Sequence, residues 1–240
     1  MKVDSNRLLF AWAGALTIGL GVVLLTGATG VRSQKFDVID VQRINVREPD
    51  GTLRMVVSSR ERFPGAILGP DREYDFDRGV AGMIFFNDEG METGGLTFAG
   101  GGADGEVKST VHLSFDPYER DQTVQLTERD HGDTESASLV FRDKSDLRIG
   151  DVMEGIKRIR ALPADQQPAA MQALAPNGTT GPQRLVVGKS DDQRAIVDLS
   201  DADGNSRLRL SVTPEGQATI EFLDADGSVV GSITPESLRQ

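Results

Sequence analysis

Apolar and polar residues alternate over much of the chain after residue 40, and short glycine-containing turn sequences interrupt this alternation. Such alternation is typical of half-buried strands, and Asp-Gly favours the tight turn of a hairpin. Placing Asp203-Gly204 in a two-residue type I′ loop brings apolar residues face to face on one side of a strand pair. The predicted pairs are Leu199 with Leu208, Val197 with Leu210, and Ala195 with Val212. On the opposite side, Asp198 faces Arg209.

The same construction applies at Gly51, Gly90 and Gly227, where mirror-image spacing again pairs apolar residues. The predicted pairs are Val46 with Met55, Ile44 with Val57, Met83 with Leu96, Ala81 with Phe98, Phe85 with Gly94, Ile220 with Ile233, and Phe222 with Gly231. At Gly216 an odd-length loop is needed, which pairs Leu210 with Phe222 and Val212 with Ile220. Residues 195–233 therefore predict a four-strand antiparallel meander.

A helical segment separates two β regions. Apolar residues recur at helical spacing over residues 151–162, Asp151 with Glu154 suggests a helix start, and Pro163 ends the pattern. A short second helix is expected near Pro168, followed by a linker rich in glycine and proline.

The N-terminal segment is the longest uncharged run of the chain. At about 1.5 Å per residue, residues 8–28 span the roughly 30 Å of a bilayer core. We therefore expect a transmembrane anchor, with the lipid bilayer as its partner and most of the chain outside the cytoplasm. The alternative is a cleaved signal peptide, with Thr26 and Ala28 at the cleavage site, which would make the protein secreted.

These elements give an all-β fold of antiparallel hairpins and a meander, with one N-terminal transmembrane helix and a short helical segment. A β-solenoid is the alternative, since glycine-cornered strands of similar length also suit stacked coils. Strands with one apolar face must cover it, so we expect the β regions to pack together or the chain to self-associate. The predicted parts are a tail (1–7), the anchor (8–28), a first β region (29–150), a helical segment and linker (151–180), and a C-terminal four-strand meander (181–240).

Composition narrows the possible functions. The formal net charge is −11, and basic patches interleaved with aromatic residues are missing, so nucleic acid is not an expected partner. The chain contains no cysteine, which excludes disulfides, thiolate metal sites and thiol nucleophiles.

No local motif predicts a catalytic, cofactor-binding or metal-binding residue. The two Asp-Ala-Asp-Gly sequences, at 201–204 and 224–227, resemble calcium loops only superficially, because apolar residues stand where ligands would be required. The two histidines, His112 and His131, lack a second histidine at ligand spacing. We therefore assign these sequences to turns and expect no cofactor.

One cluster of cations is a candidate binding site. The first hairpin places Arg47 opposite Arg54, with Arg43 farther along the same face. Like charges directly opposite one another are unfavourable, so the three arginines need partners. Carboxylates elsewhere in the chain are one possibility. The other is an anion or a partner protein, because the guanidinium group suits carboxylate and phosphate.

Residues 36–65, 81–100 and 218–230 carry "RIN…EPDGTLRMV", "FFNDEG" and "LDADG" patterns. In these patterns the chain resembles a group of uncharacterised bacterial membrane-anchored proteins. The resemblance implies a bacterial origin and brings no catalytic residue. We expect a non-enzymatic scaffold or binding module of the cell envelope, with a hydrolase whose site is assembled from loops as the alternative.

Overall fold

The computed structural model describes residues 5–27, 34–102 and 105–239 of the chain. The chain divides into two compact units, residues 1–40 and residues 41–240, and each is described by itself.

The first unit contains helix α1 (Ser5–Gly27). Among the described residues, no helix is both long enough and apolar enough to cross a membrane, so the predicted transmembrane helix at residues 8–28 is wrong. The helix begins with polar residues, and the glycines within it carry no side chain and add no apolar surface. Thr17 adds a hydroxyl, which donates to the carbonyl oxygen of Ala13 at 2.8 Å. Ala28, at the end of the predicted span and of the predicted cleavage site, lies outside the described residues.

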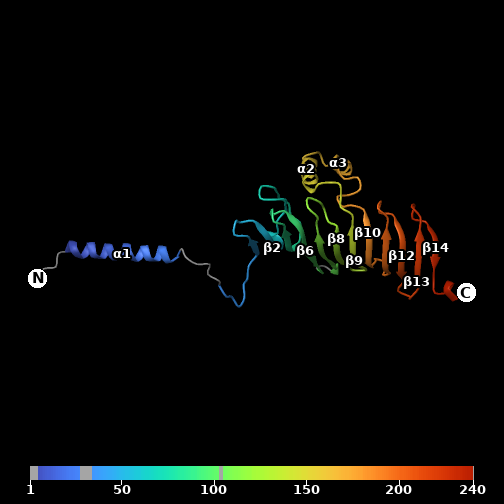
Figure 1. Ribbon diagram of the computed structural model, residues 1–240, viewed down its shortest axis with the longest axis horizontal. Coiled ribbons are helices and arrows are strands. Elements are labelled where there is room, and N and C mark those ends of the chain that lie inside the picture. Colours follow the sequence, from blue (N-terminus) through green and yellow to red (C-terminus); the bar gives the residue numbers. More distant parts are fainter. Residues whose placement is uncertain (1–4, 28–33, 103–104, 240) are drawn as a thin grey trace. The chain divides into compact units, whose positions relative to one another are not determined.

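The second unit is built on a twelve-stranded sheet in which every neighbouring pair of strands is antiparallel (Figure 1). The strands lie in chain order, so the sheet is a meander. They are β1 (Arg43–Arg47), β2 (Leu53–Ser58), β5 (Ala81–Phe86), β6 (Glu92–Gly101), β7 (Lys108–Phe115), β8 (Val124–His131), β9 (Thr134–Arg142), β10 (Gln183–Lys189), β11 (Ala195–Ser200), β12 (Ser206–Val212), β13 (Ala218–Leu223) and β14 (Val229–Ile233).

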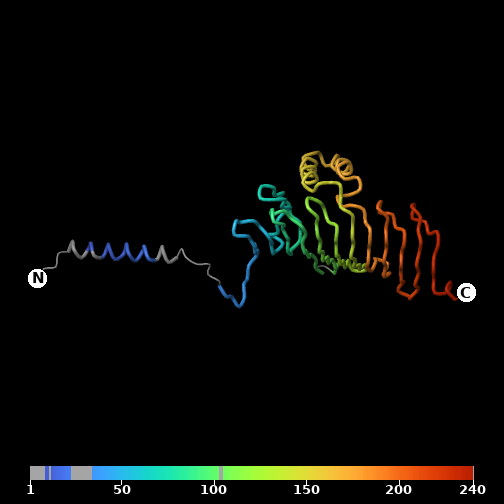
Figure 2. Tube along the Cα trace, in the orientation of Figure 1, coloured from blue at the N-terminus to red at the C-terminus, as the bar shows by residue number. Residues whose placement is uncertain are grey.

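The two predicted β regions join edge to edge, because β9 pairs with β10 across the helical segment that separates them in sequence. Figure 2 follows the chain back and forth through this seam. The all-β prediction is confirmed at this level, and the solenoid alternative is wrong, since stacked coils would pair parallel strands. The meander over residues 195–233 is also confirmed as β11 to β14, with β10 preceding it.

Six hairpins share one five-residue corner. The N–H of its first residue donates to the C=O of its fifth at 2.9 to 3.1 Å, and the N–H of the fourth donates to the C=O of the first at 2.8 to 3.2 Å. The fourth residue has positive φ, and it is glycine everywhere except at Gln193 (φ 66°). The corners span residues 48–52, 87–91, 190–194, 201–205, 213–217 and 224–228.

These corners correct the predicted turn type. A type I′ loop needs positive φ at both central residues, but Gly204 has φ 87° while Asp203 is not among the residues with positive φ. The observed corner is a three-residue loop whose last residue is left-handed, and the register shifts by one residue beside it, between Leu199 and Ser200. This bulge restores the predicted pairing of Leu199 with Leu208.

At Gly216 the predicted pairing is wrong by two residues. Leu210 pairs with Ile220, and Phe222 pairs with Leu208. No register shift follows the corner at residues 213–217. The residues at equal distances from the two ends of this corner therefore face each other along both strands, beginning with Val212 and Ala218.

Helix α2 (Ile149–Arg160) starts earlier than predicted, after Arg148, which makes no side-chain cap, and Asp151 lies in its first turn. There a carboxylate favours the helix through its dipole without capping it. The predicted second helix is confirmed as α3 (Gln167–Leu174), which lies beside α2 in Figure 1.

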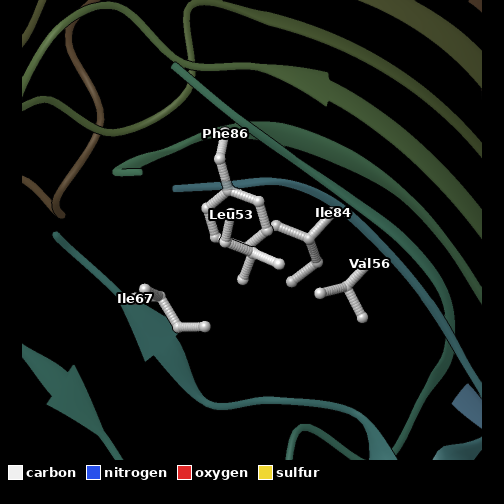
Figure 3. Close-up of a cluster of buried hydrophobic side chains, with 5 residues drawn as sticks. All are labelled: Leu53, Val56, Ile67, Ile84 and Phe86. Carbon is white, nitrogen blue, oxygen red and sulfur yellow. The ribbon is translucent and has the colours of Figure 1, made fainter. Parts of the chain in front are cut away.

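The buried core lies at one end of the sheet. A short two-stranded sheet, β3 (Ala66–Ile67) with β4 (Glu73–Tyr74), places Ile67 against residues of β2 and β5 (Figure 3). Val56 and Ile84 in this cluster are 0% and 1% exposed. The Tyr74 hydroxyl donates to Glu154 Oε1 at 2.9 Å and links this layer to α2.

Candidate interaction surface

One face of the sheet carries rows of mostly apolar residues, of which the first is unbroken. Strand alternation puts every second residue on this face, and the observed registers bring one aliphatic residue from each strand into a single line. This first row consists of Ile44, Val57, Met83, Leu96, Leu113, Leu126, Leu139, Val187, Val197, Leu210, Ile220 and Ile233.

A second row lies beside the first and combines aromatic residues with glycines. It consists of Val46, Met55, Phe85, Gly94, Phe115, Val124, Phe141, Leu185, Leu199, Leu208, Phe222 and Gly231. A third, shorter row consists of Ala81, Phe98, Val111, Glu128, Ala137, Lys189, Ala195, Val212 and Ala218. We call these three rows together the apolar face.

Much of the apolar face is open to solvent. Leu126 is 50% exposed and Phe115 is 49% exposed, whereas Val56 on the other face is fully buried. Soluble monomers rarely expose contiguous apolar patches beyond a few hundred Å². The apolar face is therefore a candidate interaction surface.

The apolar face is hollowed toward its C-terminal end. A groove of about 600 Å³ runs over β10 to β14 and is lined mainly by aliphatic side chains such as Val197 and Leu210. The segment that follows β14 forms one wall through Pro235 and Leu238. Leu238 is 73% exposed and leaves this wall largely uncovered on its outer side.

The opposite face is polar over the centre of the sheet. His112 shares hydrogen bonds with Thr127 Oγ1 at 2.9 Å and with Gln122 Oε1 at 3.1 Å. The predicted pair of Asp198 and Arg209 is confirmed, with Arg209 Nε donating to Asp198 Oδ2 at 2.8 Å. These side chains satisfy one another and act as a hydrogen-bonded layer on the sheet.

Near this layer lies a half-buried acidic side chain. The pKa of Asp116 is raised to about 7, first by burial and then by the charges of Glu92 and Asp121, while Arg78 and a hydrogen bond with Ser114 oppose the shift. Arg78 is held by Glu92 through two hydrogen bonds of 2.9 and 2.6 Å. Asp116 Oδ1 has no hydrogen-bond partner within the described part of the chain. An unpartnered oxygen in a buried acid favours the protonated form.

The three arginines of the first hairpin have different partners. Arg54 pairs with Asp88 at 2.6 Å and with Glu48 at 3.3 Å. The bulge beside the corner places Arg47 opposite Leu53 instead of Arg54, so the predicted like-charge contact is wrong.

Arg47 donates to the carbonyl of Gly51 at 2.7 Å, and Arg43 donates to Asn45 at 2.8 Å and to the carbonyl of Arg62 at 3.2 Å. Arg43 and Arg47 lie on the edge strand β1, where charge discourages pairing with another chain. Anion or partner binding by Arg43, Arg47 and Arg54 stays a prediction.

The turn carboxylates act on their own backbone. Asp201 Oδ1 accepts the N–H groups of Asp203 and Asn205 at 3.0 Å, and Arg207 donates to Asp201 Oδ2 at 2.8 Å. Burial raises the pKa of Asp201, but the hydrogen bonds together outweigh burial and lower this pKa below its ordinary value. Among the described residues, no group of three or more His, Cys, Asp or Glu side chains could hold a metal ion.

Local motifs missed the apolar face because it belongs to the whole sheet. Each hairpin prediction found a few facing pairs, such as Met83 with Leu96 and Val197 with Leu210. The signal that could have joined them is the phase of alternation across successive turns, followed from strand to strand.

No protein-family model matches the chain, and no curated protein matches it either.

Proposed function

We propose that this protein is a non-enzymatic binding or scaffold module that recognises another protein surface through its apolar face. The observation that carries the proposal is the unbroken first row, with Leu126 50% exposed at its centre. Removing such side chains from water contributes about 25 cal/mol per Å² of apolar area, which is the main driving force of association.

The polar face also supports a non-enzymatic role. On this face Arg209 is paired with Asp198, and the carboxylate of Asp201 is used by its own turn. Catalysis needs groups that are held near a reacting atom and left free to act.

The test is affinity capture by the full-length tagged protein. Leu126→Glu places a carboxylate on the apolar face at β8, and Ser136→Glu places one on the polar face of the neighbouring β9, opposite Arg129. We expect a stoichiometric partner with the wild type and with Ser136→Glu, and at least about tenfold less with Leu126→Glu.

Equal recovery of the partner by all three proteins would contradict the proposal. Turnover of a hydrolase substrate that neither substitution changes would instead favour the alternative, an envelope hydrolase with a loop-assembled site.

The place of action is a separate proposal. We propose that the uncharged N-terminal segment directs export and is cleaved next to Ala28, which releases residues 29–240 as a secreted protein. Mass spectrometry of the mature N-terminus tests this, and a mature chain that retains residues 1–28 would contradict it.

A further inference from the structure

We infer that the occupant of the apolar face is a second copy of this chain, related by a twofold axis that runs parallel to the strands along β9. This inference rests on the proposed function and names the partner for the same surface. Two sheets would then lie face to face, about 10 Å apart, and their apolar rows would form a shared core.

The size of the face suits a stable homodimer. Twelve strands about 4.8 Å apart, with three rows about 7 Å apart, give a face of roughly 1,000 Å² per copy. A stable interface buries about 800 Å² per partner, and homodimer interfaces are the more apolar class. The extent of the face therefore matches a partner surface that is equally broad and equally apolar.

One pair of opposite charges in the third row is complementary about this axis. In the third row, Glu128 on β8 and Lys189 on β10 flank Ala137 on β9. A twofold axis along β9 exchanges the strands on its two sides, so Glu128 of each copy faces Lys189 of the other. Lys189 also binds Glu135 within its own chain, and Glu128 has no ion-pair partner among the described residues.

The same axis sets a large residue against glycine at two places. In the second row it sets Met55 against Gly231 and Gly94 against Leu208, because these strands lie at equal distances on either side of β9. The first row sets aliphatic residues against aliphatic residues from β2 to β14, and Ile44 on β1 has no counterpart.

The acidic character of the chain favours this occupant over a lipid surface. The net charge is −11, which an anionic membrane repels, and the third row offers that membrane only one lysine. A second copy presents the same nearly uncharged face, so association keeps the acidic corners of both chains in water.

The first experiment measures mass and affinity with the full-length protein. Light scattering after size exclusion should give twice the 25.9 kDa of one chain for the wild type and for Ser136→Glu. Leu126→Glu introduces a carboxylate from each copy into the interface and should raise the dimer Kd at least about 100-fold.

The second experiment tests the orientation, and the absence of native cysteine gives it a clean background. Single cysteines are placed in the third row and cross-linked with a short bismaleimide. Ala137→Cys on the axis should cross-link to itself. Val111→Cys should not cross-link to itself but should cross-link to Ala195→Cys in a mixture. Ser136→Cys on the polar face is the control and should remain uncross-linked.

The outcomes separate the two proposals. A wild type that stays monomeric at high concentration, yet captures another protein through Leu126, overturns the homodimer and leaves the proposed function standing. Monomers that bind phosphatidylcholine vesicles through the same face also overturn it. A dimer that Leu126→Glu leaves intact would contradict both.

Discussion

Asp116 is a carboxyl group that the fold prefers to keep protonated. Its pKa is raised from 3.8 to about 7, mainly by burial and then by Glu92 and Asp121. Between these two values the folded protein holds a proton that the unfolded chain has released, so stability falls as pH rises from about 4 to 7. Below that window the group contributes no difference, and above it the whole penalty is present.

Asp116→Asn should therefore stabilise the protein at pH 8 by about 1–3 kcal/mol and have little effect at pH 4. The asparagine keeps the shape of the acid and removes the ionised form. Urea unfolding of both proteins between pH 4 and 8 measures the difference. If the free energies of unfolding of the two proteins differ by the same amount at every pH from 4 to 8, Asp116 does not titrate within this range.

Gly94 shows how close neighbouring strands come in the second row. It has φ 135°, and a Cβ atom at this position would lie 2.3 Å from the carbonyl oxygen of Ser114. Gly94→Ala should cost about 2–4 kcal/mol, since the backbone of one strand must move and the residue must hold a strained φ. Gly101 lies in the same strand with nothing within 4 Å, so Gly101→Ala is a matched control expected to change stability by less than about 1 kcal/mol.

At the scale of elements, the shared corner explains which pairs could be predicted. Mirror-image spacing about the glycine found Val46 with Met55 and Leu199 with Leu208, although the assumed loop was one residue too short. The bulge beside each of these corners supplied the missing residue. The corner at residues 213–217 has no bulge, and its composition of proline, glutamate and glycine gives no local sign of that difference.

The predicted pairing of Arg47 with Arg54 is wrong because of one such bulge. Whether Arg54 faces Arg47 depends on the bulge between Val46 and Arg47, and its carboxylate partner Asp88 comes from another corner. The sequence of a single hairpin predicts neither the bulge nor the pairing with Asp88. Most facing apolar pairs within one hairpin were thus accessible from the sequence, except across the corner at residues 213–217, and contacts between hairpins depended on the register of the whole sheet.

Gln193 offers a test of the corner itself. It holds the left-handed position with φ 66°, where the other five corners have glycine. Gln193→Gly should stabilise the protein by about 0.5–1 kcal/mol, because a side chain at positive φ is strained.

Gln193→Ala is the matched control, since it also removes the side-chain hydrogen bond to the carbonyl of Glu135 but keeps the Cβ atom. It should not stabilise the protein. Chemical denaturation of the three proteins compares them, and a glycine variant no more stable than the alanine variant would contradict the assignment of strain.

At the scale of the molecule, burial is uneven. Ile84 is 1% exposed in the cluster with Val56 and Ile67, whereas Leu126 is half exposed in the middle of the sheet. Ile84→Ala should cost about 2–5 kcal/mol and Leu126→Ala about 1 kcal/mol or less in dilute monomer. Thermal unfolding at low protein concentration compares them, and equal losses would show that the apolar face is buried within one chain.

Association through the apolar face would also make stability depend on concentration. Anything that binds only the folded chain raises its apparent stability by mass action, so the wild-type Tm should rise with protein concentration. The Tm of Leu126→Glu should stay constant over the same range. Scanning calorimetry over a hundredfold dilution series measures both, and a constant wild-type Tm would count against self-association.

The shared corner also has a consequence for how such a molecule could have grown. Each corner closes its own hydrogen bonds within five residues, and each strand needs only the strand before it to set its register. Duplication of two successive strands, each with its corner, would widen the sheet by about 10 Å. The apolar residues of the added strands would stay on the apolar face. Tandem gain or loss of short strand-and-corner segments can therefore change the number of strands and the width of the sheet.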